Sequence, residues 1–376
     1  MSQINVRNLS NENEDGAPDI VGVSTFSATS YIVPPKGTTA QRPTNPQPGE
    51  LRFNTDTASL EYYRGDTIGW SQFELIDPEL GGGTGSNTGL GTRGVFAGGL
   101  SPSLSDVIDF LTISTLGDTQ DFGDISAGKQ SMSAVGSRTR ALNIGGYTTS
   151  HENEIEFVTF ASQGNITDFG NLTSNKNRTA SCSDQVRGIT GGGNPNTNVI
   201  EYLTIAQTGN GVDFGDLTVA RQSAGSFSSS TRGIFAGGYI EPTYSDTIDF
   251  ITISSTGNAT DFGNLTSIRM YMGSSSNSTR GVMGGGNDAS RTNTIEFVTI
   301  ATTGDATNFG DLTSARTDLA GASSPTRAVF VSGDTPTLVN TIDYVEILTT
   351  GDAVDFGDQT TKRDRPSGCS NGHGGL

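Results

Sequence analysis

Residues 231–238, Thr-Arg-Gly-Ile-Phe-Ala-Gly-Gly, open a pattern that recurs six times along this chain. They are followed by an acidic-aromatic segment, Thr-Ile-Asp-Phe (247–250), and then by Asp-Phe-Gly-Asn (261–264). The opening arginine returns at near-constant steps of 47, 47, 45, 48 and 47 residues, at Arg93, Arg140, Arg187, Arg232, Arg280 and Arg327. A period of this length is typical of a solenoid, an array or a propeller, so the repeat determines the fold.

Each repeat predicts four strands. In the fourth repeat the first strand lies within 221–230, which has mostly small side chains, and the second is 233–238. The third is 247–254 and the fourth surrounds 261–265. Alternating apolar and polar residues bounded by Gly, Asn and Ser indicate half-buried strands. The Gly-Gly pair that ends the second strand allows neighbouring backbone to approach closely.

The two ends of the array predict a closed ring. The array begins at Arg93 with a second strand, and its last segment, 363–371, matches a first strand. The unpaired strand at each end of the array supplies the strand that the other end lacks. An open solenoid would instead need distinct capping repeats, and none is visible in the sequence. We therefore expect an all-β fold, a six-bladed β-propeller over 92–376 that is closed by its C-terminal strand.

The repeats resemble those of kelch-type β-propellers over roughly residues 92–371. The resemblance lies in the Gly-Gly pair, the acidic-aromatic third strand, and a basic residue that opens each first strand: Lys129, Lys176, Arg221, Arg269, Arg316 and Arg363. It implies closure by a C-terminal strand. The chain departs from that family by having Phe where kelch repeats usually place a fourth-strand Trp, and by Ser332-Gly333 in place of the last Gly-Gly.

Residues 1–80 form a different, N-terminal region, joined to the repeats by a Gly-rich linker at 81–91. A small β-meander is predicted within 50–75, with strands at Glu50–Asn54, Ser59–Arg64 and Trp70–Glu74. So small a sheet has little stability alone, so we expect it to pack on copies of itself or on a partner. The candidate docking or oligomer interface consists of four aromatic residues, Tyr62, Tyr63, Trp70 and Phe73.

A second resemblance concerns function. The segment 33–73 contains Pro-x-Gly-Thr-Thr-Ala-Gln-Arg-Pro, Gly-x-Leu-Arg-Phe-Asn-Thr and Leu-Glu-Tyr-Tyr-x-Gly, and resembles a module of bacteriophage tail fibres and other virion proteins. The repeats with Asp-Phe-Gly-Asp are similar to those in structural proteins of marine, especially cyanobacterial, phages. Together they imply a virion component made in the host cytoplasm. Its expected partners are other virion proteins, copies of itself, and a host-surface glycan or receptor.

Composition excludes several classes of function. The net charge of −18 disfavours binding to nucleic acid and to anionic membrane surfaces. Residues 1–20 are polar, so we expect no cleaved secretory signal, and no run reaches the roughly 18 apolar residues that membrane insertion requires. Cys182 and Cys369 occupy equivalent positions of two repeats, which predicts free thiols.

Few residues offer chemistry. Asp-Phe-Gly at 121–123 also occurs in protein kinases, but here it repeats around the ring without a phosphate-binding loop or a His-Arg-Asp sequence. Asp118, Asp121 and Asp124 have an oxygen spacing that suits either turn formation or Ca²⁺. The two histidines, His151 and His373, lack triad partners. No catalytic, cofactor-binding or metal residue is assigned.

Two further sets of residues are open to alternative interpretations. The acidic third-strand residues either form a ring around the axis or pair with repeat-equivalent basic residues such as Arg140 or Arg187: Asp109, Glu156, Glu201, Asp249, Glu296 and Asp343. The loops between second and third strands differ among repeats, and Tyr239 and Tyr244 in the longest loop form a candidate surface-binding site that could stack on a sugar. Tolerated surface variation is the alternative.

The expected function is that of a non-enzymatic phage virion structural protein. We expect a tail-fibre or tail-associated component that displays its propeller for host-surface contact, gaining strength from many copies. The alternative is a purely architectural part, a capsid decoration or a neck or nozzle component. A third possibility is a hydrolase of surface glycans, although no carboxylate pair stands out from the repeat background.

Overall fold

The computed structural model describes residues 34–56, 59–72 and 92–376. The chain divides into two compact units, with the boundary between residues 76 and 77. Both are built from β-strands, and the one helical element among the described residues is a short 3-10 turn, Thr39–Gln41. No described helix has the length and apolar character to cross a membrane.

The N-terminal unit contains a four-stranded sheet, ordered β1 (Lys36–Gly37), β2 (Leu51–Asn54), β3 (Ser59–Tyr63) and β4 (Trp70–Gln72). Strands β2 to β4 form the predicted antiparallel meander. The structure adds a fourth strand that was not predicted, because β1 pairs with β2 in parallel. Backbone bonds hold β1 in place, from Phe53 N–H to the Pro35 carbonyl and from Thr55 N–H to the Gly37 carbonyl. The predicted strand end at 73–74 and the linker at 81–91 lie outside the described residues.

The centre of this sheet is an ion cluster around Glu61, which is fully buried. Arg42 donates two hydrogen bonds to its carboxylate, at 3.2 and 2.6 Å, and Asn54 donates a third at 3.0 Å. Arg52 lies opposite Glu61 on β2, 3.5 Å from the carboxylate. The hydrogen bond from Arg42 is the main reason that the pKa of Glu61 lies below its usual value.

The second unit contains six four-stranded antiparallel sheets. The first two are β32 (Ser367–Ser370), β5 (Arg93–Ala97), β8 (Val107–Thr112) and β9 (Gln120–Asp124), then β10 (Ser133–Gly136), β11 (Arg140–Ile144), β12 (Glu154–Thr159) and β13 (Thr167–Asn171). The next two are β14 (Ala180–Ser183), β15 (Arg187–Gly191), β16 (Val199–Thr204) and β17 (Val212–Asp216), then β18 (Gly225–Ser228), β19 (Arg232–Ala236), β22 (Thr247–Thr252) and β23 (Thr260–Asn264). The last two are β24 (Gly273–Ser276), β25 (Arg280–Gly284), β26 (Thr294–Thr299) and β27 (Thr307–Asp311), then β28 (Ala320–Ser323), β29 (Arg327–Asp334), β30 (Leu338–Glu346) and β31 (Val354–Asp358).

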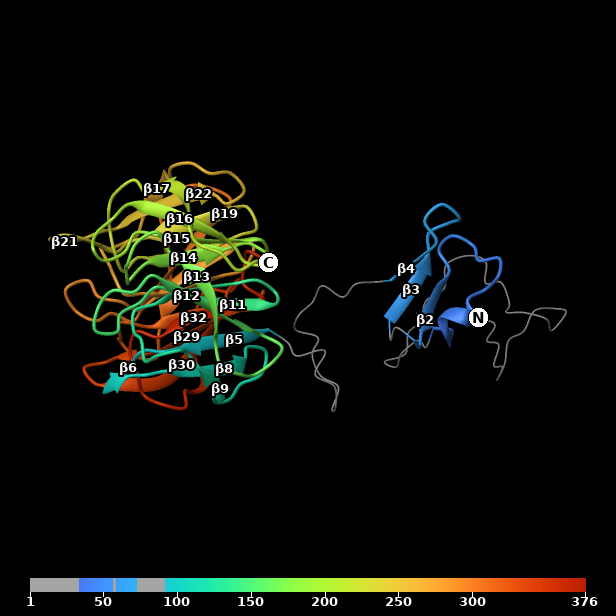
Figure 1. Cartoon of the computed structure of the whole chain (residues 1–376), viewed down its shortest axis with the longest axis horizontal. Coiled ribbons are helices and arrows are strands. Elements are labelled where there is room, and N and C mark those ends of the chain that lie inside the picture. The colour runs from blue at the N-terminus through green and yellow to red at the C-terminus, as the bar shows by residue number, and fades with distance from the viewer. Residues whose placement is uncertain (1–33, 57–58, 73–91) are drawn as a thin grey trace, which may run out of the picture. The chain divides into compact units, whose positions relative to one another are not determined.

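This arrangement is all-β and propeller-like, as the repeat predicts. Strands from the two ends of the array share one sheet, because β32 pairs with β5 from Ser367 opposite Ala97 to Ser370 opposite Gly94 (Figure 1). The predicted pairing between the first and last strands of the array is therefore present. Two short hairpins extend from the sheets, β6 (Leu100–Ser101) with β7 (Ser103–Leu104) and β20 (Tyr239–Ile240) with β21 (Thr243–Tyr244).

The hydrophobic core lies between neighbouring sheets. Phe110 and Phe122 of the first sheet meet edge to face, with ring centroids 5.7 Å apart. They share a buried cluster with Val158 of β12, in the second sheet, and with Phe160, which follows that strand. The same aromatic pair occurs in every repeat, with ring centroids 5.7 to 6.2 Å apart. Because each cluster spans two sheets, no sheet can bury its apolar face alone.

The repeated arginine that opens each second strand links one sheet to the next. Arg140 lies 4.6 Å over the ring of Phe157 in its own sheet and donates to the Ile205 carbonyl after β16, at 3.1 Å. Arg187 does the same with Tyr202 and the Ile253 carbonyl. The expected ion pairs of Arg140 and Arg187 with third-strand carboxylates are therefore wrong, since these guanidinium groups lie on aromatic faces instead.

Candidate functional site

The acidic third-strand residues pair with the basic residue that precedes the first strand of the same sheet. We call these twelve residues the paired layer: Lys129–Glu156, Lys176–Glu201, Arg221–Asp249, Arg269–Glu296, Arg316–Asp343 and Arg363–Asp109, with N–O distances of 2.5 to 3.1 Å. All twelve are buried. The expected pairing with a repeat-equivalent basic residue is therefore confirmed, although the partner is not Arg140 or Arg187, and the alternative of an open carboxylate ring around the axis is wrong. Both lysines pair with glutamates, and three of the four arginines pair with aspartates.

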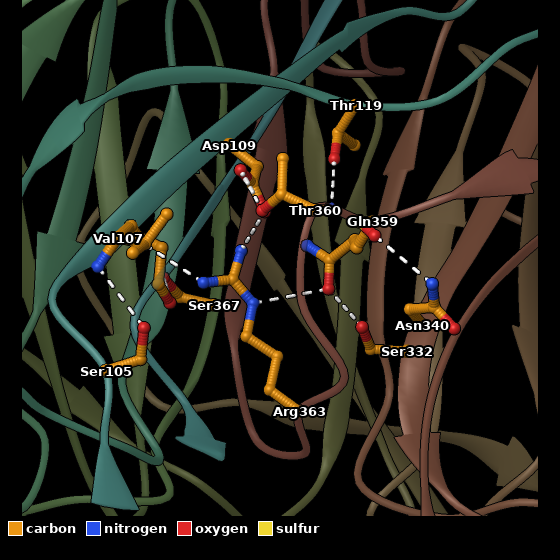
Figure 2. A network of polar contacts seen from close by, with 11 residues as sticks. Ser105, Val107, Asp109, Thr119, Ser332, Asn340, Gln359, Thr360, Arg363 and Ser367 are labelled. Atoms are coloured by element: carbon orange, nitrogen blue, oxygen red, sulfur yellow. Dashed lines mark hydrogen bonds and ion pairs between the residues drawn. The ribbon is translucent and has the colours of Figure 1, made fainter.

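The last repeat modifies this layer (Figure 2). Arg363 donates to Asp109 at 2.6 Å and to the Gln359 amide oxygen at 3.2 Å, and that oxygen also accepts from the Ser332 hydroxyl. Ser332 has φ +60°, at the position where the other repeats have glycine with φ of 60° to 67°. Gln359 replaces an apolar residue, such as Leu217 or Leu265, that packs beside that glycine. The loss of the first glycine of the pair, where Ser332 stands, is therefore compensated by the hydrogen bond between Ser332 and Gln359.

Two residues beyond each basic member of the paired layer, the backbone turns left-handed. We call these six residues the rim: Ser131, Arg178, Ser223, Tyr271, Asp318 and Arg365, with φ between 55° and 61°. A left-handed conformation costs a non-glycine residue about 1 to 2 kcal/mol. None of the six is glycine, so every repeat accepts this cost and keeps a side chain at the rim. Strain of this kind is frequent at functional sites.

The rim is held by a cycle of backbone hydrogen bonds. Each rim N–H donates to the carbonyl of the rim residue in the preceding repeat, over 2.9 to 3.1 Å. The cycle runs from Ser131 to Arg365, Asp318, Tyr271, Ser223, Arg178 and back to Ser131. All six rim residues thus have the same backbone geometry, whatever their side chains.

The rim surrounds a cavity of about 150 Å³ that is lined by residues of all six first strands. Arg365 bonds to Asp318 at 3.2 Å and to the Gln130 side chain at 3.0 Å, while Arg178 lies 5.1 Å over the ring of Tyr271. Burial raises the pKa of Asp318 and of Tyr271, although Arg365 and Arg178 oppose these shifts. Tyr271 therefore stays a neutral phenol at neutral pH. We call this cavity the axial pocket.

The axial pocket has a floor. Deeper along the first strands, serine hydroxyls donate to the carbonyl of the preceding repeat, as from Ser228 to Ser183 and from Ser276 to Ser228, both at 2.7 Å. In this narrower section His373 donates Nε2–H to the Gly136 carbonyl at 2.8 Å and accepts the Gly375 N–H at Nδ1. Burial lowers the pKa of His373, so the imidazole remains neutral.

The aromatic residues predicted for binding have separate positions. Tyr239 and Tyr244 pair across the β20–β21 hairpin, with ring centroids 5.9 Å apart and ring planes tilted by 58°. In the N-terminal unit, Tyr63 is buried and bonds to Asp66, and its ring lies 5.4 Å from Trp70. Tyr62 points to the opposite face of the sheet. Phe73 lies outside the described residues.

Arg42 and Arg52 both lie over the ring of Trp70, at 5.8 and 6.0 Å. Of the three predicted interface residues that the structure describes, Tyr63 and Trp70 pack against each other within their own unit. That these residues form a docking surface stays a prediction.

The repeated Asp and Asn turns connect neighbouring sheets. The Asp118 carboxylate accepts the N–H of Asp358 at 2.9 Å, and Asn165 accepts that of Asp124 at 3.1 Å. Among the described residues, no group of three or more His, Cys, Asp or Glu side chains is arranged to hold a metal ion. Cys182 and Cys369 are free and buried, as predicted, and burial raises the pKa of both thiols to about 12.

Sequence reasoning missed the rim. Its members lie two residues after the repeated basic residue, so the spacing is regular, but their side chains differ from repeat to repeat. In the comparisons with known proteins, no protein-family model matches this chain, and no curated protein matches its sequence. The resemblances to kelch-type propellers and to phage virion proteins therefore stay predictions.

Proposed function

We propose that this chain is a non-enzymatic virion protein of a bacteriophage, located on a tail fibre or elsewhere on the tail. In this proposal the second unit is a kelch-like, six-bladed β-propeller, closed by its C-terminal strand, that contacts the host surface. The N-terminal region attaches it to other virion proteins or to copies of itself. The host partner is a surface glycan or receptor, contacted by many copies at once.

The observation that carries this proposal is where the varied loops lie. The residue before each rim residue pairs with the start of a loop between a second and a third strand: Gln130 with Tyr147, Asn177 with Asn194, Gln222 with Tyr239, Met270 with Asn287, Thr317 with Asp334 and Asp364 with Leu100. The loops that differ most among repeats therefore gather around the axial pocket. A uniform scaffold that presents varied loops and side chains on one face suits recognition of a surface.

Three further features support the architecture and the absence of catalysis in this proposal. The β32–β5 pairing and the hydrogen-bond cycle of the rim support a closed ring of six blades. The third-strand carboxylates are neutralised by buried basic partners, as in the pair of Arg316 with Asp343. Such carboxylates are poorly suited to the acid and base roles of a glycan hydrolase.

The test is to locate the protein on intact particles with gold-labelled antibody against residues 92–376. Label on the tail or its fibres is the expected result. Label on the capsid or neck would favour the architectural alternative, and absence of both label and protein from purified particles would overturn the virion role. Deletion of residues 1–91 should abolish incorporation, whereas truncated protein that still assembles would exclude the docking role of this region.

A further inference from the structure

Arg178 differs from the other rim arginine, because its guanidinium has no hydrogen-bond acceptor among the described residues. No described residue accepts a hydrogen bond from this side chain, and its Nε is buried. Arg365 differs, since Asp318 and Gln130 accept its hydrogen bonds. A guanidinium has five N–H donors, and buried polar groups normally have partners. The Arg178 side chain is therefore held in the axial pocket by contact with Tyr271, and none of its donors bonds to another described residue.

We propose that the axial pocket binds one small hydroxylated carboxylate, the chemistry of an acidic sugar residue, through the Arg178 guanidinium. The planar fork of arginine matches a carboxylate with two parallel hydrogen bonds. Tyr271 keeps this fork in place by stacking against it, so the donors need little reorganisation when the ligand arrives.

The charge of the pocket favours a single negative charge. The rim holds two arginines and one aspartate, and Arg365 with Asp318 already form an ion pair at 3.2 Å. The charge that remains is the one on Arg178. A carboxylate neutralises it, whereas a dianion such as phosphate would meet the carboxylate of Asp318 without a second free cation.

The lining and depth of the pocket favour a small ligand with hydroxyl groups. Hydroxyls of Ser133, Thr179 and Ser181 line the wall and bond to one another at 2.6 and 2.7 Å. Such groups can exchange partners with ligand hydroxyls because each both donates and accepts. The C-terminal segment crosses the lower end, where His373 bonds to the Gly136 carbonyl and the Gly374 N–H bonds to the Ser276 carbonyl of another sheet, so a polymer cannot thread through. A terminal residue or side branch of a glycan fits this shape.

The biological source of the ligand rests on the proposed host-surface role, but its binding test does not depend on where the protein lies on a particle. Isothermal titration calorimetry of the full chain would use sodium glucuronate and N-acetylneuraminate, with glucose and sodium sulfate as comparisons. We expect one site that binds at least one of the two acids and neither comparison compound. Arg178→Gln should weaken that binding about tenfold to a hundredfold, the loss of charged hydrogen bonds.

Arg178→Lys should give an intermediate loss, because the charge stays and the fork is lost. Arg138→Gln is the matched control, since Arg138 is an exposed arginine in the turn between β10 and β11 that does not line the pocket, and it should leave affinity unchanged. Melting temperatures of all three variants check folding. Equal binding of sulfate, equal binding of glucose, unchanged affinity in Arg178→Gln, or no binding of either acid would each overturn the proposal. Gold labelling of the tail would still support the proposed function in those cases.

Discussion

The basic residues of the paired layer and the rim residues lie two positions apart, on the segments that lead into the six first strands, and the two sets differ in how their side chains vary. In the paired layer one chemistry occurs six times, always a buried cation beside a buried carboxylate of its own sheet. In the rim the backbone repeats almost without change, while the side chains are serine, arginine, tyrosine or aspartate. Repeated side chains thus build the scaffold, and varied side chains on a repeated backbone give the scaffold an individual surface.

The largest effect should come from breaking one pair of the paired layer. Asp249→Asn leaves the Arg221 cation fully buried without its anion, and it weakens the bond from the Thr218 hydroxyl at 2.6 Å. We expect a loss of about 3 to 5 kcal/mol in the free energy of unfolding, because an uncompensated buried charge is costly. Urea denaturation monitored by far-ultraviolet circular dichroism measures this loss.

The control is the double variant Arg221→Met with Asp249→Leu, which removes both charges. Replacing a buried pair with apolar residues is often close to neutral, so this variant should regain most of the lost stability. If the single and double variants lose the same amount, the pair contributes through shape and not through charge.

The next effect concerns Asp364, which lies between Arg363 of the paired layer and Arg365 of the rim. Burial raises its pKa to about 6, and its nearest cation, Arg365, is 3.8 Å away. Because the folded pKa exceeds the usual 3.8, the folded protein binds this proton more tightly than the unfolded chain. The stabilising contribution of the protonated group is therefore present at low pH and is lost as pH rises through about 6.

Asp364→Asn removes this titration. We expect the variant to exceed the natural protein by about 2 kcal/mol in unfolding free energy at pH 8, with the advantage declining towards zero near pH 4. Melting curves of both proteins from pH 4 to 8 provide the comparison. An advantage that does not change with pH would show that the carboxyl of Asp364 is not the group responsible.

How far the sequence predicts this molecule depends on whether a feature repeats. The strand pattern, the β32–β5 pairing and the free thiols follow from equivalent positions in the repeats. The basic partner of Glu156 could not be predicted in this way, because Arg140 and Lys129 both have equivalents in every repeat. Pairing register decides the matter: Arg140 lies opposite Thr159, whereas Lys129 reaches Glu156 from the approach to β10.

Features without a repeat or a side-chain pattern could not be predicted. Strand β1 has two residues, held by backbone hydrogen bonds that any sequence can make. The rim is recognised by a backbone dihedral angle, and its six members share no single side-chain type. Only the three-dimensional structure shows that these dissimilar side chains line one cavity.

A smaller effect tests the last repeat, where the paired layer has been altered. Gln359 is 2% exposed and its Nε2 has no acceptor among the described residues, while Ser332 keeps a left-handed backbone. The double variant Ser332→Gly with Gln359→Leu restores the arrangement of the other repeats, and we expect a gain of about 1 kcal/mol. Gln359→Leu alone should destabilise, because the Ser332 hydroxyl would lose its partner. Thermal unfolding of four proteins, namely the natural protein, Ser332→Gly, Gln359→Leu and the double variant, forms a double-mutant cycle.

The smallest effect tests whether the rim is strained. Ser131 has φ +55° and its hydroxyl bonds to no described residue, so Ser131→Gly relieves the backbone without removing a contact. The left-handed cost of about 1 to 2 kcal/mol is partly offset by the greater freedom of glycine in the unfolded chain, of about 0.4 to 1 kcal/mol. We expect a net gain of about 0.5 kcal/mol. Ser228→Gly is the contrast, since Ser228 lies in a strand and donates to the Ser183 carbonyl at 2.7 Å, and it should lose stability. If both substitutions destabilise equally, the left-handed backbone at Ser131 carries no strain. Backbone strain then gives no reason to assign the rim a function.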